Sequence, residues 1–581
     1  MSKLLLLSAA LLFTFSVVAQ DRVVTGKVTS SEGPLPGTNV LLKGTPLGTT
    51  TDADGNFSLT APPEGVLVFS FIGFKTQEVA VGNKTTINIS LEADQQLMAE
   101  VLVVGYGTQS KAEFTGSATR VSASSLQEIP VQSFDQALIG RAAGVQISLP
   151  NGVLNNAPVI RVRGVNSISQ SSYPLIVIDG IPVTAGDNLG TTSVPNNPLA
   201  DINPSDIESI DVLKDAASTS IYGSRGANGV ILVTTKRGKE GKAKVTYDAW
   251  VGWTTPVRLP ELLKAEQYME IKNEARANAN QADAFFPSFN ADGSLVDTKW
   301  YDQIFQTGVS HNHAVSVSGG TAKTQYFFST NLSRQQGILQ TNEFDRQGMR
   351  FNVNHEVNDW LKLTGGINYT KSENRSPNSG SLDGNAQGII GAARMAWTLA
   401  PNVPVYNADG TPHLNFNDAN VTIGNGANTV VSVYYNPVTL FKHRLESSAN
   451  DRILANFGAT LTLAKGLTFT TNYSADRLII TNKIIAEPVP GSSGYSTRGS
   501  ISNINSIINN TDFANTLQYE TRFGLHHISA LAGSDVQEFS TDAWGANVQQ
   551  AADPYFVNYQ GTWGQISATG NSLSDKAFLS Y

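Results

Sequence analysis

The sequence predicts a mainly β protein: a small β-sandwich and a compact α+β domain, followed by a transmembrane antiparallel β-barrel that is incomplete in this chain. After residue 239, segments alternate polar and apolar residues, and the connections between them alternate between short turns and long excursions. Both features are typical of strands with one wet face and one lipid face. Composition agrees, because only 15% of residues are charged while 51 are glycine and 24 are proline. Such a composition is typical of sheets and turns.

Composition also excludes several classes of protein. The chain has 40 lysines and arginines against 48 acidic residues, a net charge of -8, so it lacks a basic footprint for nucleic acid. With 0 cysteines it has no disulfide, thiolate zinc site, thiol nucleophile or lipidated cysteine. A hydrophobic fraction of 40% and a mean hydropathy of -0.13 exclude a bundle of membrane helices.

Residues 1–20 have the pattern of a signal peptide. Lys3 supplies a positive start, Leu4–Phe15 an apolar core, and Val17–Ala19 a small-residue cleavage site. The alternative is a membrane anchor, but the apolar run is shorter than the ~20 residues that a spanning helix requires. We therefore expect export and removal of this segment.

Residues 21–93 contain short strand-like runs separated by Gly, Pro, Asp and Asn, which predict a small β-sandwich. Within it, Thr51–Asn56 superficially matches a calcium loop. The glycine does not follow the third ligand, however, and no glutamate closes the loop. A hairpin turn is the favoured interpretation.

Residues 94–110 form a polar linker around one apolar strand, EVLVVGYG, at Glu100–Gly107. A lone apolar strand between polar segments is a candidate for addition to the edge of a partner's sheet. The glycines at 105 and 107 do not make a dinucleotide-binding fingerprint, because the third glycine and the opening helix are missing.

An ordered series of motifs resembles one family closely. VLVVGYGTQ is followed by FDQALIGRAAGV at Phe134–Val145, then by IRVRG, PLIVIDGIP and INPSDIESIDVLKDAASTSIYGSRGANGVILVTTKRG. This series resembles the SusC/RagA group of TonB-dependent outer-membrane transporters. Residues 21–93 resemble the carboxypeptidase regulatory-like module, which is an immunoglobulin-like domain and not itself a peptidase.

The resemblance implies a domain order and a function. Residues 111–238 would be the plug and residues 239–581 the first part of the barrel, in the outer membrane of a Gram-negative bacterium. The N-terminal module and the TonB box would lie in the periplasm, and the box would consist of Glu100, Val101, Leu102, Val103, Val104, Gly105, Tyr106 and Gly107. The implied activity is active import of oligosaccharides or oligopeptides, and the implied partners are TonB with its ExbB/ExbD complex, a SusD-like lipoprotein and outer-membrane lipid.

The residues of the expected plug predict a compact mixed domain. A helical turn ended by glycine lies in SFDQALIGRAAGVQI, and four short apolar runs predict strands. Gly223, Gly226 and Gly229 could suggest a phosphate-binding loop, but no G-x-x-x-x-G-K-[ST] motif occurs. Tight turns that join a helix to a strand are the favoured interpretation.

About nine strands are predicted after residue 239, with apolar residues outward and polar residues inward, and KAFLSY begins another. Their alternating segments begin at Ala243, Asn312, Thr324, Arg350, Leu361, Arg452, Leu467, Phe513 and His526. Long excursions are expected at 253–309, 371–451 and 476–512, and the first of them contains a predicted helix at 259–279 that is more typical of packing than of ligand binding. A soluble sandwich, the alternative, has no reason to keep its long loops at one end.

Plugged barrels have about 22 strands, and bacterial barrels close with an even number. We therefore expect further barrel sequence after Tyr581, and an open sheet edge in the chain as it stands.

No pattern supports an enzyme, a cofactor or a metal site. His311 and His313 share a face of a predicted strand, but no third ligand is readable, so lumen-facing or rim histidines are favoured.

Within transport, the alternative function is that of a siderophore or cobalamin receptor. From another class, the alternative is a surface adhesion or scaffold protein, which would need neither a docking strand nor a plug; a secreted peptidase has still less support.

Overall fold

The computed structural model describes most of the chain. It covers residues 22–30, 33–45, 47–71, 74–92, 101–104, 107–110, 117–122, 131–149, 152–165, 172–185, 194, 196–376, 391–416, 423–424, 436–492, 494–524, 526–553 and 561–580. The predicted signal peptide lies outside these residues. Two compact units are present, Met1–Leu102 with Thr108–Thr115, and Val103–Gly107 with Gly116–Tyr581.

The first unit contains two small sheets that share one core. One has the order β2-β1-β5 with β8 beside β1, and the other β4-β3-β6-β7. The strands are β1 (Arg22–Ser30), β2 (Gly33–Pro34), β3 (Asn39–Leu42), β4 (Gly48–Thr50), β5 (Asn56–Ala61), β6 (Val66–Ser70), β7 (Gln77–Ala80) and β8 (Ile89–Ser90). Val24 and Phe57 from one sheet pack with Leu67 and Phe69 from the other, which confirms the predicted β-sandwich.

The turn at Thr51–Asn56 differs from the prediction in one respect. It is tight, because the Asp52 carboxylate accepts backbone hydrogen bonds from Asp54 and Asn56 at 3.0 and 2.8 Å. It joins β4 to β5, however, and these strands belong to different sheets. The turn is therefore a connection between the two layers of the sandwich, and the expectation of a hairpin was wrong.

The plug region forms a five-stranded sheet of order β11-β16-β17-β14-β15 beside a β12-β13 hairpin. Its strands are β11 (Ala118–Ser122), β12 (Val145–Ser148), β13 (Val159–Val162), β14 (Leu175–Ile178), β15 (Ile181–Val183), β16 (Ile207–Leu213) and β17 (Val230–Thr235). Its helices are α4 (Phe134–Ala137), η1 (Pro198–Asp201), η2 (Pro204–Asp206), α5 (Ala216–Thr219) and η3 (Ser220–Gly226). Apolar side chains from these elements form one core, as predicted for a compact mixed domain.

The three glycines lie between α5 and β17, as expected: Gly223 is at a kink within η3, Gly226 ends η3, and Gly229 directly precedes β17. Gly223 and Gly229 have φ of 59° and 90°, which glycine adopts at little cost. At Gly229 a Cβ would also lie 2.9 Å from the Cβ of Val162. Glycine at this position therefore allows the start of β17 to pack closely against Val162 at the end of β13.

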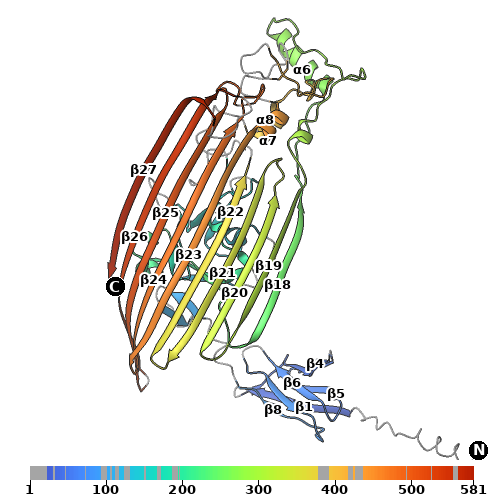
Figure 1. Cartoon of the computed structure of the whole chain (residues 1–581). Coiled ribbons are helices and arrows are strands. Elements are labelled where there is room, and N and C mark those ends of the chain that lie inside the picture. Colours follow the sequence, from blue (N-terminus) through green and yellow to red (C-terminus); the bar gives the residue numbers. More distant parts are fainter. Residues whose placement is uncertain are drawn as a thin grey trace, which may run out of the picture. The chain divides into compact units, whose positions relative to one another are not determined.

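Ten antiparallel strands follow and pair in chain order into one sheet (Figure 1). They are β18 (Gly241–Thr254), β19 (Gly308–Gly320), β20 (Thr324–Gln336), β21 (Glu343–Asn358), β22 (Leu361–Arg375), β23 (Arg444–Ala464), β24 (Leu467–Ala486), β25 (Ser500–Phe523), β26 (His526–Ala551) and β27 (Trp563–Ser580). Within the described residues, β18 and β27 each pair on one side only.

The number and length of these strands correct two expectations. The tenth strand begins at Trp563, well before KAFLSY. The prediction missed its first half because that half shows little alternation of polar and apolar residues. The excursion expected at 476–512 is mostly strand, since β24 runs to Ala486 and β25 starts at Ser500. Regular pairing therefore continues beyond the alternating segments.

The two faces of the sheet have the predicted character. On β21, Arg350 is 8% exposed while its neighbour Phe351 is 44% exposed. Across β19 to β23, buried inward positions are mostly Ser, Asn, Thr, Gln and Arg, and outward positions include Val315, Phe328, Met349, Ile367 and Ile453. The apolar-out, polar-in pattern is confirmed for β19 to β23.

The long connections carry helices at the end of the sheet away from the short turns (Figure 1). These are α6 (Ala265–Asn278), η4 (Trp300–Gln303), α7 (Ala392–Thr398) and α8 (Pro437–His443). Around Trp300, Met395 and Leu440 they share a core. The predicted helix is present as α6, but its expected packing role is limited, because Ala265 is its one fully buried residue. No described helix combines the length and the apolar character needed to cross a membrane.

Candidate functional site: the plug and the inner face of the sheet

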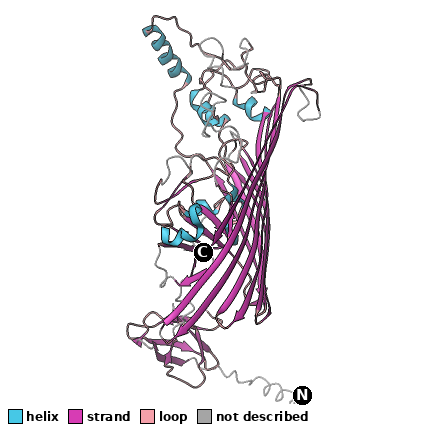
Figure 2. Cartoon of the chain, turned by 90° about the vertical axis from the view of Figure 1, so that its left-hand side faces the viewer, coloured by secondary structure: helices cyan, strands magenta, loops and turns pink. Residues whose placement is uncertain are grey.

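The plug lies against the polar face of the ten-stranded sheet (Figure 2). Side chains of β20 to β25 reach it across long separations in sequence. They include three arginines, Arg346, Arg350 and Arg452, each buried and each bound to the plug. Because a strand exposes alternate residues on one face, Arg346 and Arg350 of β21 point the same way as Arg452 of β23.

Arg350 forms a buried ion pair with the plug. Its Nη2 lies 2.6 Å from Oδ2 of Asp179, which occupies the β14–β15 turn, and it also donates to the hydroxyl of Thr235. Burial alone would raise the pKa of Asp179, but Arg350, Arg237 and the Thr235 hydrogen bonds hold it below its usual value. Asp179 is therefore charged, and it fixes the end of β14 to β21.

Arg346 binds carbonyl groups of the plug. Its Nη1 donates to the carbonyl oxygens of Ala200 at 2.7 Å and Gln132 at 3.1 Å. Close by, Asp206 of η2 is fully buried; burial raises its pKa against the opposing effects of Arg350 and a hydrogen bond with Ser329. The contact combines a buried cation, backbone carbonyls and a carboxyl group that is less acidic than usual.

Arg452 links β23, β24 and the plug. Its guanidinium binds both carboxylate oxygens of Asp476, at 2.9 and 2.7 Å, and donates to the carbonyl of Pro198 at 2.7 Å. Asp476 in turn accepts a 3.4 Å hydrogen bond from the backbone of Thr184. Both side chains of this pair are fully buried, so neither has water to replace a lost partner.

Amide and hydroxyl groups complete the contact around η1. Ser372 donates to Asp201 at 2.7 Å, and Asn450 donates to the same carboxyl group at 3.1 Å. Asn196 donates to Ser448 at 2.8 Å and to Asn450 at 2.7 Å. These directional bonds hold the plug in one position, and separating it from the wall requires all of them to break.

The predicted docking segment is described in part. Val101–Val104 forms β9, which pairs with β10 (Gly107–Ser110) in a two-stranded sheet. Glu100, Gly105 and Tyr106 lie outside the described residues, and the rest of the segment is described without its side chains. The segment is divided between the two compact units, because Leu102 belongs to the first and Val103 to the second.

The comparisons with known proteins agree with this architecture. Residues 24–103 match the CarboxypepD_reg-like domain, and residues 110–230 match the TonB-dependent Receptor Plug Domain. TonB-dependent receptor P26 of Formosa agariphila is 34% identical over 534 residues, which cover 90% of this chain and 49% of that receptor. TonB-dependent receptor SusC of Bacteroides thetaiotaomicron is 37% identical over 389 residues, covering 66% of this chain and 37% of SusC.

The same fold occurs in solved structures. The RagAB peptide importer in its open-open state matches with a TM-score of 0.67 at 23% identity, over 83% of this chain and 54% of that one. In the closed-closed state the TM-score is 0.64, also at 23% identity, over 80% and 53%. The chain belongs with the SusC/RagA-type TonB-dependent receptors. It spans about half the length of the curated receptors P26 and P3 that it matches.

As a SusC/RagA-type receptor, the chain is an outer-membrane protein, as the resemblance implied. The proteins it resembles are receptors and importers, not enzymes.

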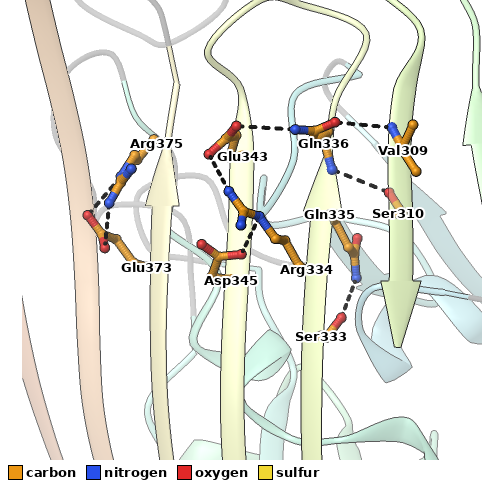
Figure 3. Close-up of polar contacts among 10 residues, drawn as sticks. All are labelled: Val309, Ser310, Ser333, Arg334, Gln335, Gln336, Glu343, Asp345, Glu373 and Arg375. Atoms are coloured by element: carbon orange, nitrogen blue, oxygen red, sulfur yellow. Dashed lines mark hydrogen bonds and ion pairs between the residues drawn. The ribbon is translucent and has the colours of Figure 1, made fainter. Parts of the chain in front are cut away.

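The outward face of the sheet has a charged border near the long loops (Figure 3). Arg334 of β20 lies 3.6 Å from Asp345 and 3.8 Å from Glu343 of β21, and Arg375 of β22 lies 3.1 Å from Glu373. Toward the short turns the same face is apolar, so these pairs mark where that apolar surface ends.

The two histidines of β19 also lie on the outward face. Ser310, Asn312 and Ala314 are buried on the inner face, so His311 and His313 point the other way. His313 Nδ1 is 2.7 Å from the hydroxyl of Tyr247. Of the two expected positions, lumen-facing or rim, the structure supports the rim. Among the described residues, no group of three His, Cys, Asp or Glu side chains could hold a metal ion.

We expect the stability of this receptor to depend on pH through the buried carboxyl group of Asp201. Burial raises its pKa to about 6, against the opposing effects of Arg452 and of hydrogen bonds from Ser372 and Asn450. A raised folded pKa means that the proton stabilises the folded state; this contribution is complete below about pH 4 and lost as pH rises through about 6. Asp201→Asn removes it, so the melting temperature of the unaltered chain should fall relative to that of Asp201→Asn between pH 4 and 6. A constant difference across that range would contradict this assignment.

Proposed function

We propose that this receptor imports large nutrients, oligosaccharides or oligopeptides, across the outer membrane with energy delivered by TonB. The supporting observation is the plug, which is held on the inner wall by buried ion pairs and hydrogen bonds to β20 through β25. Breaking all of these buried ion pairs and hydrogen bonds at once has a high free-energy cost, which thermal motion alone does not supply. A pathway through the lumen therefore needs an external force on the plug.

The force would act through Glu100–Gly107, the proposed TonB box. An extended apolar segment can pair with a partner's sheet through backbone hydrogen bonds, and the segment directly precedes the plug in the sequence.

The proposed domain boundaries are residues 1–20 for the signal peptide, 21–93 for the sandwich module, 94–110 for the linker, 111–238 for the plug and 239–581 for the barrel portion. The proposed partners are TonB with ExbB/ExbD and a SusD-like surface lipoprotein, and we propose no enzymatic activity.

Removing the proposed TonB box tests this function. Deletion of residues 100–107 should abolish uptake while binding at the cell surface remains, because the loops and the plug are unchanged. Val103→Pro should act similarly, since proline cannot donate the backbone hydrogen bond that strand pairing requires. Uptake of labelled nutrient and surface binding are measured in the same cells.

Two controls accompany the deletion. Removal of residues 94–99 shortens the linker by a similar length but leaves the box, and Val103→Ile keeps the backbone donor. Both controls should import normally. Undiminished uptake after deletion of residues 100–107 would overturn the proposed mechanism.

A further inference from the structure

Two turns with the same sequence pattern occur on different long connections. Residues 289–294 read FNADGS and residues 406–411 read YNADGT. The first lies between β18 and β19, and the second between β22 and β23. In each, an aromatic residue precedes Asn, Ala, Asp, Gly and a hydroxyl residue.

Both turns fold in the same way. In the first, Asn290 N donates to Ser294 O at 2.9 Å, and in the second Asn407 N donates to Thr411 O at 2.7 Å. The Asn side chain donates to the hydroxyl oxygen at 3.0 Å in both. Each glycine has φ of 81°, and each aromatic residue is held in a β-bridge. The pattern therefore specifies a closed turn with an aromatic ring at its base.

The two turns meet at one cavity of about 660 Å³. That volume is in the range of small-ligand sites. Phe289 and Tyr406 both line it, and its charged and amide residues are Asn290, Asp297, Lys299, Asp302, Gln303 and Asn407. Residues that are distant in the chain thus form a single hollow on the long-loop side of the sheet.

The walls of the cavity are joined by hydrogen bonds. Thr298 donates from its backbone to Pro401 O and from its hydroxyl to Val403 O, both at 2.7 Å. The indole of Trp300 donates to Ala400 O at 2.9 Å, and Trp300 packs with Val403 in the loop core. The two segments are therefore fixed relative to each other before a ligand arrives, which lowers the entropic cost of binding.

The lining favours a sugar. Phe289 and Tyr406 are 64% and 47% exposed, and such rings can cover the apolar face of a sugar ring. The carboxylates of Asp297 and Asp302 accept hydrogen bonds, while Lys299 donates, which suits hydroxyl groups that do both. A peptide strand would instead pair through backbone groups, and in these turns the backbone N–H groups of Asn290 and Asn407 are already bonded to Ser294 O and Thr411 O.

We infer that this cavity binds a short oligosaccharide, with sugar rings stacked on Phe289 and Tyr406 and hydroxyl groups bound by the polar side chains between them. Binding here follows from the cavity alone. Its role as a capture site ahead of import rests on the function proposed above.

The binding test uses the full chain purified in a sugar-free detergent. Probes are neutral gluco-, xylo- and manno-oligosaccharides of three to eight units, with peptides of three to eight residues as the opposing panel, and affinity is measured by calorimetry. Phe289→Ala and Tyr406→Ala should each weaken oligosaccharide binding about tenfold, as loss of one aromatic contact predicts. Tyr406→Trp should retain it.

Phe286→Ala is the matched control, because Phe286 is on the same connection, is 58% exposed and does not line the cavity. Its affinity should be unchanged. Binding of peptides but not oligosaccharides, or equal affinity in Phe289→Ala and the unaltered chain, would overturn the inferred site. Uptake separates the two proposals: binding without any import by the unaltered protein contradicts the importer, whereas import that is unchanged in Phe289→Ala/Tyr406→Ala contradicts only the capture role.

Discussion

Linking the plug to the wall through Asn196→Cys and Ser448→Cys is expected to stop uptake completely and reversibly. Asn196 Nδ2 lies 2.8 Å from Ser448 Oγ, and both side chains are buried at the contact between plug and sheet. The chain has 0 cysteines, so the two new thiols are the only ones. A short thiosulfonate cross-linker joins them, and a reductant separates them again.

The physical reason is that import requires a path through the lumen, and the link keeps this part of the plug on β23. Uptake should fall to background after cross-linking and recover after reduction. Each single-cysteine variant, treated with the same reagent, should import as before. Full uptake by the linked protein would mean that the plug opens without leaving this part of the wall.

Loss of Arg452 is expected to have the largest effect on stability. Arg452→Ala leaves Asp476 buried without its bidentate partner and removes the bond to Pro198. Breaking a buried pair by removing one partner costs about 3 to 5 kcal/mol. Denaturant unfolding of the purified chain in detergent, followed by tryptophan fluorescence, should show this loss in the free energy of unfolding.

Two further variants define the cause. The double variant Arg452→Ala/Asp476→Ala should be less destabilised than the sum of the single variants, because no unpaired charge remains. Arg334→Ala removes an arginine from the exposed border in Figure 3, and its loss should cost at most about 1 kcal/mol. If Arg452→Ala were no worse than Arg334→Ala, the buried network would not hold the plug.

The sequence predicted most elements because their signals are local. The strand segments starting at Arg350 and Leu361 show their inner and outer faces by alternation alone, and the structure confirms both. Where alternation fades, prediction failed: the start of β27 at Trp563 and the extension of β24 to Ala486 carry no clear period. The sequence left a lumen-facing and a rim position open for His311, and the burial of its neighbours Ser310 and Asn312 decides for the rim.

The plug contacts could not be predicted in the same way. Asp179 and Arg350 are 171 residues apart, and no local sequence feature near either residue identifies the other as its partner. An arginine in a predicted strand, such as Arg350 or Arg452, was the one available signal, and Arg346 lies before the predicted segment. An unpaired guanidinium facing a lumen must find an acceptor, but sequence does not say which.

The amino-acid order therefore accounts for the sandwich, four of the plug strands with the helical turn at α4, about nine of the ten strands, and the apolar and polar faces of β19 to β23. These follow from side-chain alternation, turn residues and apolar runs, which act over a few residues. Tertiary structure decided which plug carboxylates meet the three wall arginines, and that Phe289 and Tyr406 share one cavity. Such pairings depend on strand register and on the packing of distant loops, because hydrogen bonds and cavities form only where separate segments converge.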